Sequence, residues 1–220
     1  MIRAKKSKER VDAKVAGLSA EIDRFKGRRA GYSNLVAELA GKLAARFLLT
    51  DAEKSSLQIA ARLSGIGELA MGRGSGGSPA KLNPTVTADI QRHPVIGEQE
   101  INNLRFDRMS QLAVRWHSEN WDGSGFPDAL REQEIPLICR ILRVADFFVS
   151  ISETNPAMGP RAVLESLKDS AGIELDPSVV MVLSELEMFE IRKEVESPIV
   201  DTFSDTSAAE GDGNEAEVTS

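Results

Sequence analysis

One stretch of the chain, residues 114–146, most restricts the fold, because it joins a helix end, a tight turn and a new helix start. The segment holds both tryptophans and one of the two histidines. Residues 122–127 read Asp-Gly-Ser-Gly-Phe-Pro, two turn dipeptides followed by a pair that fixes the direction out of the turn. Pro136 suits the first turn of a helix, where its missing N–H costs nothing. The sequence therefore predicts a helix that ends near Glu119, a turn, and a buried helix that begins at Pro136.

The rest of the chain has the pattern of amphipathic helices, with apolar residues recurring at three- and four-residue steps. Thr50 and Glu53 form a capping box, and Asp176 before Pro177 is a second helix start. The apolar face of the helix before the capping box extends to Leu48. Since we find no convincing strand and no internal repeat, we predict an all-α bundle. The predicted helices span residues 1–27, 33–48, 50–71, 85–91, 94–104, 106–119, 136–151, 160–170 and 176–195.

The two ends of the chain differ in composition from its middle. Residues 1–27 begin with a basic run and carry a sparse apolar stripe, which predicts a helix packed on the domain or paired with a second copy. Residues 72–84, rich in glycine and serine, predict a linker, because they lack the Gly-Lys-Ser/Thr ending of a phosphate-binding loop. The acidic C-terminal segment has no lysine or arginine, which predicts a disordered tail. The predicted divisions are a helical extension (1–28), a helical domain (29–195) and the tail (196–220).

Composition excludes several classes of protein. With 220 residues, 41% of them hydrophobic and 28% charged, the chain resembles soluble globular proteins. Its formal charge of −7 argues against nucleic acid as a partner. No apolar run approaches the ~20 residues that span a bilayer, and the N-terminus lacks the apolar core of a secretory signal. The single cysteine, Cys139, lies in an apolar segment, so we expect a buried thiol in a cytoplasmic protein.

Two segments resemble a known family. Residues 117–127 read His-Ser-Glu-Asn-Trp-Asp-Gly-Ser-Gly-Phe-Pro, which is similar to the HD-GYP signature His-His-Glu-x-Trp-Asp-Gly-Ser-Gly-Tyr-Pro. Residues 93–97, His-Pro-Val-Ile-Gly, match the His-Pro-x-x-Gly of that family, and the segment from Ile135 to Asp146 is similar to the family's segment downstream of its signature. The resemblance covers roughly residues 31 to 190. It implies an HD-domain helical bundle in a bacterial signalling protein that hydrolyses cyclic di-GMP at two or three metal ions.

The resemblance also implies that most residues that hold those metals are replaced in this chain. The turn keeps its shape-determining residues, Asp122, Gly123, Gly125 and Pro127. The replaced positions are Tyr32 (an early histidine), Ser64 and Gly65 (the defining His-Asp pair), Glu68 (a lysine), Ser118 (the second histidine of the signature) and Phe126 (the tyrosine).

Three residues remain at ligand positions, His93, His117 and Asp146, and two histidines with one carboxylate form a known open metal site. Each residue also has a structural interpretation. His93 caps or packs against the helix that begins at Pro94, His117 packs in the core, and Asp146 pairs with Arg143 one turn earlier. Gly65 lies inside a predicted helix, where glycine costs about 1 kcal/mol relative to alanine. A metal-free domain would then be held by packing alone.

These losses predict a degenerate, catalytically inactive HD-GYP-like domain that acts as a regulatory module and binds a protein partner or a second copy. We expect no cofactor. The first alternative is a phosphohydrolase that uses one iron, manganese or zinc ion on His93, His117 and Asp146. The second is a receptor that binds cyclic di-GMP without cleaving it, although Glu68 in place of the lysine would repel a phosphate. The third is a purely structural domain.

Overall fold

The computed structural model describes residues 2–74 and 91–196, and the side chains of 9–72 and 91–186. Within these ranges the chain is helical, and its only β pairing is an isolated bridge between Ala171 and Leu175. The structure confirms the all-α prediction. None of the helices described is both long and apolar enough to cross a membrane. The α-helices are α1 (Ile2–Phe25), α2 (Tyr32–Ala44), α3 (Asp51–Leu63), α4 (Ile66–Gly74), α6 (His93–Asn103), α7 (Arg108–Arg115), α8 (Leu137–Thr154), α9 (Pro160–Ser170) and α10 (Pro177–Glu196).

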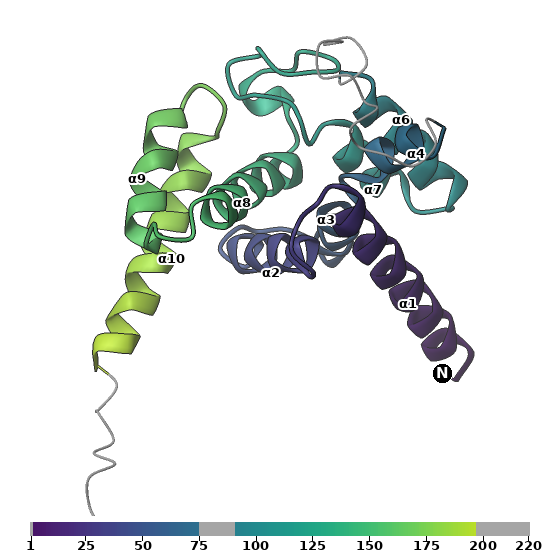
Figure 1. Cartoon of the computed structure of the whole chain (residues 1–220), viewed down its shortest axis with the longest axis horizontal. Helices are drawn as coiled ribbons and strands as arrows, with labels where there is room; N and C mark the ends of the chain where they lie inside the picture. The colour runs from purple at the N-terminus through teal and green to yellow at the C-terminus, as the bar shows by residue number, and fades with distance from the viewer. Residues whose placement is uncertain (1, 75–90, 197–220) are drawn as a thin grey trace, which may run out of the picture.

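The core forms where α2, α3 and α8 pack together at the centre of the molecule (Figure 1). Figure 1 shows α4, α6 and α7 on one side of these helices and the α9–α10 hairpin on the other. Leu43, Leu57 and Ile141, one from each central helix, are fully buried. Each such side chain stabilises the fold by about 1.5–3 kcal/mol relative to its exposed state. The segment between α7 and α8 crosses from one side of the core to the other and carries the predicted turn.

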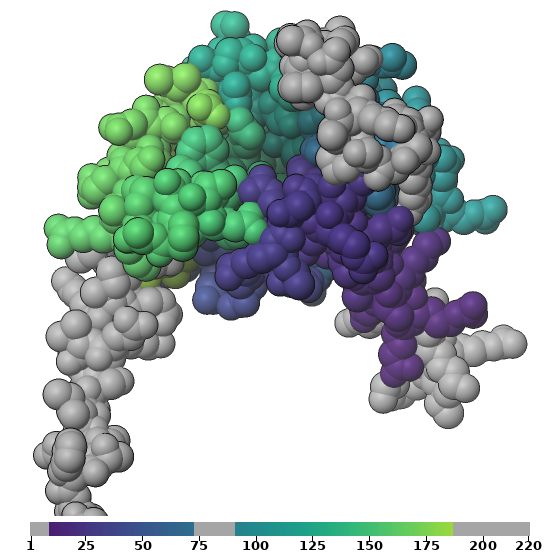
Figure 2. All heavy atoms as spheres, viewed as in Figure 1, coloured from purple at the N-terminus to yellow at the C-terminus, as the bar shows by residue number. Residues whose placement is uncertain are grey.

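The helix α1 packs on the domain through its second half. Val15 and Ile22 are buried against the core, whereas residues 9–14 are exposed and project from the body of the molecule (Figure 2). Of the two predictions made for residues 1–27, packing on the domain is therefore confirmed for the second half of the helix. The predicted tail lies outside the described residues.

Several predicted helix boundaries are wrong. The predicted helix 50–71 is interrupted by a turn at Ser64 and Gly65, so the cost of a glycine inside a helix does not apply there. Residues 72–74 belong to α4 and not to a linker, and residues 75–84 and most of the predicted helix 85–91 lie outside the described part of the chain. The helix predicted to reach Glu119 ends at Arg115, because Trp116 leaves helical geometry.

Other local signals in the sequence predicted the structure correctly. The capping box is present, with the Thr50 hydroxyl accepting from the Glu53 N–H and the Glu53 carboxylate accepting from the Thr50 N–H. The helix α9 begins and ends where the sequence predicts. By contrast, Leu48 is fully exposed and not part of the apolar face of α2, because the helix ends at Ala44 and the chain turns.

Cys139 provides a first test of the packing around α8. Its side chain is 1% exposed, and burial raises the pKa of the thiol from 9.0 to about 12. The thiolate is the reactive form, so at pH 8 we expect iodoacetamide to modify the folded protein about 1,000-fold more slowly than the protein in guanidinium chloride. Mass spectrometry of timed samples measures both rates. Equal rates would mean that the α8 core is open in solution.

Candidate functional site

The two histidines of the chain lie next to each other, with their ring centroids 5.1 Å apart and their ring planes tilted by 59°. His93 is the first residue of α6 and is buried, and His117 lies just after the end of α7. Their Nε2 atoms are 3.2 Å apart. The Nδ1 atom of His117 is 2.7 Å from the carbonyl oxygen of Val114, which can only accept. Nδ1 therefore carries the proton, so that His93 Nε2 donates to His117 Nε2 when both rings are neutral.

The environment of His117 keeps its ring uncharged. Burial, and then the neighbouring His93, hold the pKa of His117 well below 6.5, and the positive charges of Lys26 and Arg143 lower it further. His93 is the first residue of α6, directly after the N-cap residue Arg92, and its side chain is buried, as the packing interpretation expects. The ring of Phe126, from the predicted turn, meets the ring of His93 edge-on with centroids 5.8 Å apart.

A glutamate and a lysine complete this cluster. Glu68 lies on α4 with Oε1 3.9 Å from His93 Nε2. The same oxygen is 2.8 Å from the Nζ atom of Lys26, the residue directly after α1. Lys26 was not among the residues predicted from the sequence. It belongs to no motif, so no feature of the sequence pointed to it.

The third predicted ligand, Asp146, does not lie with the two histidines but accepts a hydrogen bond from Tyr32. The hydroxyl of Tyr32 donates to Asp146 Oδ1 at 2.9 Å. Burial and the Asp146 carboxylate raise the pKa of Tyr32, so its hydroxyl stays protonated and remains a donor. The predicted pairing of Asp146 with Arg143 is wrong, because Arg143 instead pairs with Glu174 at 3.0 Å.

The turn between α7 and α8 is held by its own hydrogen bonds. The buried carboxylate of Glu119 accepts from the backbone N–H groups of Asp128 and Leu130, at 2.8 and 3.1 Å. Asp122 accepts from the Ser124 N–H at 2.8 Å, as in an Asx-turn. Gly123 has a φ of +82°, which favours glycine. Glu119 and Asp122 therefore stabilise the turn through these hydrogen bonds. Ser118 is buried beside them, and its carbonyl oxygen accepts from the Phe126 N–H.

The donor set does not fit the metal centre that the family implies. Two histidine nitrogens 3.2 Å apart have the spacing of two ligands on one ion, but a protein site needs at least a third. Asp146 is hydrogen-bonded to Tyr32, and positions 64 and 65 carry a serine and a glycine. Over residues 9–72 and 91–186, no three His, Cys, Asp or Glu side chains form a group that could hold a metal ion.

The cations around this region each have a carboxylate partner among the described residues. Lys26 pairs with Glu68, Arg143 with Glu174, and Arg28 with Glu153 at 2.9 Å. A phosphate entering the site would have to displace one of these carboxylates, which lowers the expected affinity for a nucleotide.

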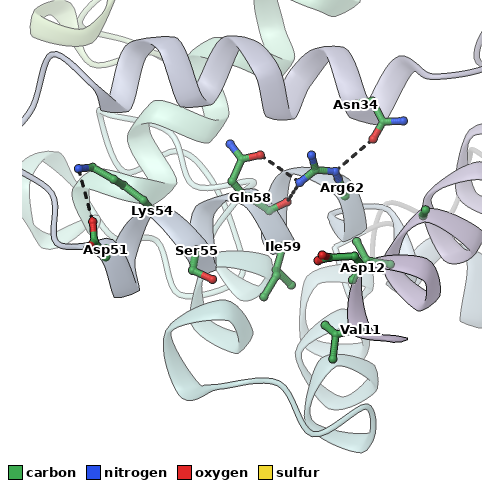
Figure 3. Close-up of a pocket in the computed structure, with 11 residues that line it drawn as sticks. Val11, Asp12, Asn34, Asp51, Lys54, Ser55, Gln58, Ile59 and Arg62 are labelled. Atoms are coloured by element: carbon green, nitrogen blue, oxygen red, sulfur yellow. Dashed lines mark hydrogen bonds and ion pairs between the residues drawn. The ribbon is translucent and has the colours of Figure 1, made fainter. Parts of the chain in front are cut away.

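A separate groove of about 1080 Å³ runs between α1 and α3 (Figure 3). Val11, Val15 and Ile59 form its apolar part. Its polar side chains bond to one another, with Arg62 donating to Asn34 Oδ1 at 3.1 Å (Figure 3). None of the predicted site residues is among the described residues that line it, so the groove is not part of the histidine site.

The chain is similar to known proteins over most of its length. The sequence profile of the HD domain family matches residues 16–179. The cyclic di-GMP phosphodiesterase response regulator RpfG of Xanthomonas campestris is 30% identical over 80% of this chain and 48% of its own length. The 3'3'-cGAMP-specific phosphodiesterase 3 of Vibrio cholerae is 30% identical over 70% of this chain and 34% of its own. The chain thus spans half or less of these relatives.

Two solved structures share the fold. One is a cyclic GMP-AMP specific phosphodiesterase from V. cholerae, with a TM-score of 0.67, 18% identity, and coverage of 83% of this chain and 50% of the other. The other is Bd1817, an HDG"Y"P protein from Bdellovibrio bacteriovorus, with a TM-score of 0.57, 20% identity, and coverage of 71% and 51%. At these identities the likeness concerns the fold.

Proposed function

Because this chain belongs to the HD domain family, with HD-GYP phosphodiesterases among its relatives, we propose that it is a non-hydrolysing regulatory module of that type. It binds a protein partner or a second copy of itself and uses no metal. The family's hydrolytic members depend on metal ions, and metal chemistry needs several imidazole and carboxylate ligands that converge at one place. In this chain those groups bind to one another instead.

The observation that carries the proposal is the hydrogen bond from Tyr32 to Asp146. The bond joins a position where the family has a histidine to a position where it has an aspartate. The tyrosine hydroxyl is a poor replacement for an imidazole ligand, because its raised pKa keeps it protonated. The Tyr32 hydroxyl and the Asp146 carboxylate provide each other's hydrogen-bond partner, so this part of the site is stable without a metal ion.

One observation favours a second candidate, a phosphohydrolase with a single metal ion. The 3.2 Å separation of the two Nε2 atoms suits two ligands of one ion, and the curated relatives named above are phosphodiesterases. A receptor that binds cyclic di-GMP without cleaving it has less support, because Lys26, Arg28 and Arg143 are all paired with carboxylates.

A turnover experiment separates these functions. Purified full-length chain is incubated overnight with excess Mn²⁺ or Fe²⁺ and with cyclic di-GMP or 3'3'-cGAMP, and the nucleotides are separated by chromatography. We expect no product above the level of the His117→Ala variant, because the third ligand is missing. Metal-dependent cleavage that disappears in His117→Ala would overturn the proposal and establish the phosphohydrolase. Calorimetry with cyclic di-GMP tests the receptor, and we expect no binding heat.

A further inference from the structure

A second, smaller groove lies between α2 and α8. Its volume is about 210 Å³, and its apolar lining includes Leu35, Leu39 and Phe148, which are all half-buried. None of the histidine-site residues is among the described residues that line it. Small-molecule pockets typically measure about 300–1,000 Å³, so this groove is too small for a cyclic dinucleotide and suits one large side chain of a peptide.

The rim of this groove carries a net positive charge. Arg29 and Lys42 line it, and Glu38 is the only carboxylate among its described lining residues. Lys42 pairs with Glu38 at 3.2 Å, but the two side chains are 57% and 65% exposed, and such a pair contributes little. Glu153, which accepts from the Arg29 N–H, already pairs with Arg28. The rim therefore favours a ligand with carboxylates on either side of an apolar group.

The C-terminal tail of the chain has this composition. Residues 197–220 hold six acidic residues and no lysine or arginine. Their single aromatic residue, Phe203, stands between Asp201 and Asp205. Because alternate residues of an extended chain point to opposite sides, a carboxylate two positions away lies on the same side as the ring. One phenylalanine with two flanking carboxylates thus matches an apolar groove with a basic rim.

The tail also starts close enough to reach this groove. Arg46, just after α2, pairs with Glu185 of α10 at 3.4 Å, so the two helices meet there. The helix α10 continues for about 16 Å beyond Glu185, at 1.5 Å per residue, and Pro198 disfavours a longer helix. Residues 197–203 span about 23–25 Å when extended, so a tail that turns back brings Phe203 to the level of α2.

The larger groove between α1 and α3 suits the tail less. Its charged lining residues cancel in pairs: Asp12, Asp51, Lys54 and Arg62. It also lies along α1, and Figure 1 shows α1 and α10 on opposite sides of α2. Since the tail follows α10, the groove between α2 and α8 is both the nearer one and the one with complementary charge.

We propose that the acidic tail folds back onto its own domain and places Phe203 in the groove between α2 and α8. In this position, the carboxylates of Asp201 and Asp205 lie against the basic rim. A partner that binds this face must displace the tail, so the tail regulates access to it. The inference goes beyond the proposed function and does not depend on it, because the groove and the histidine site share no described residue.

Disulfide trapping in the full chain tests where the tail lies. Ser152→Cys places a thiol in the groove, Ser204→Cys places one beside Phe203, and the native Cys139 is buried. The control replaces Ser152→Cys by Ser184→Cys on α10. Both serines are half-buried, and the hydroxyl of each donates to the carbonyl oxygen four residues earlier. Ser184 is closer along the chain to the tail and does not line the groove.

Under mild oxidation we expect the intramolecular disulfide to form about 10-fold faster with Ser152→Cys than with Ser184→Cys, since docking raises the effective concentration of the tail at the groove. Mass spectrometry of quenched samples measures both rates. A tail that moves freely would trap both thiols at similar rates, which would overturn the inference. Disulfide-linked dimers in place of the intramolecular product would overturn it in favour of the tail of a second copy.

A second measurement leaves the tail itself unchanged. Chymotrypsin cleaves after aromatic residues, so docking should protect the bond after Phe203. We expect cleavage there to be about 3-fold faster or more when Arg29→Glu and Lys42→Glu reverse two exposed charges of the rim. Lys54→Glu reverses an exposed charge of the larger groove and should leave the rate unchanged. Equal cleavage of the rim variant and the unmodified chain would contradict the proposed docking.

Discussion

Gly67→Ala is expected to lower the free energy of unfolding by about 3 kcal/mol or more, the range of severe overpacking. A Cβ atom on Gly67 would collide with the carbonyl oxygen of His93 and lie 2.8 Å from the backbone nitrogen of Gly97. These are backbone atoms of α6, so no side-chain rotation can relieve the contact. The helix α4 would have to move away from α6, and Glu68 would move away from His93.

Gly17→Ala is the matched control, because a Cβ on this glycine of α1 meets nothing within 4 Å. Alanine is the better helix former, so this variant should be more stable by about 0.5–1 kcal/mol. Urea unfolding followed by circular dichroism measures both variants. If Gly67→Ala unfolds at the same urea concentration as the unmodified protein, the close packing of α4 on α6 is wrong.

Arg140→Ala should have the second largest effect, a loss of about 3–5 kcal/mol in the free energy of unfolding. Arg140 Nη1 is 2.6 Å from Asp176 Oδ2, and the Asp176 side chain is 1% exposed. Truncation leaves a buried carboxylate without its cation, although Ser178 still donates to its other oxygen. The variant also removes the hydrogen bond from Arg140 Nε to the Ile135 carbonyl oxygen, which holds the start of α8.

The control for Arg140→Ala is Arg46→Ala, which breaks an ion pair on the surface. Arg46 lies 3.4 Å from Glu185, and the two side chains are 48% and 55% exposed. Exposed pairs contribute little, so we expect a change within about 0.5 kcal/mol. Equal losses in the two arginine variants would mean that the Arg140–Asp176 pair is not buried in solution.

The local signals in the sequence predicted the helices that depend on local chemistry. A proline in the first turn and a regular apolar stripe define α9, and the Thr50–Glu53 capping box defines the start of α3. The break between α3 and α4 was not predictable from periodicity, since apolar residues continue in phase on both sides of Ser64 and Gly65. The break lies where α1 packs closely against Gly65, a contact between segments about 40 residues apart that periodicity does not reveal.

In the site, too, local sequence signals identified some residues, whereas the contacts between distant segments were not predictable. The fold brings the two histidines together as their family positions imply, and it places Tyr32 against Asp146 because those positions also converge. The resemblance predicted at which positions this chain differs from the HD-GYP pattern, but not the contacts that the side chains at those positions make. Lys26 contributes to the site from outside any motif, and only the packing of α1 reveals it. Arg143 lies at ion-pair spacing from Asp146 along α8, yet it pairs across the turn with Glu174.

The most direct test of the central claim is the metal content of the purified, untagged protein, measured by elemental mass spectrometry. The protein is analysed as isolated and again after incubation with Mn²⁺, Fe²⁺ or Zn²⁺ and desalting. We predict far less than one equivalent of any of these metals in a protein that is nonetheless folded, because its candidate ligands bond to one another. About one equivalent or more of a transition metal, lost in His117→Ala, would contradict the proposal of a metal-free module. It would instead support a metal-dependent phosphodiesterase.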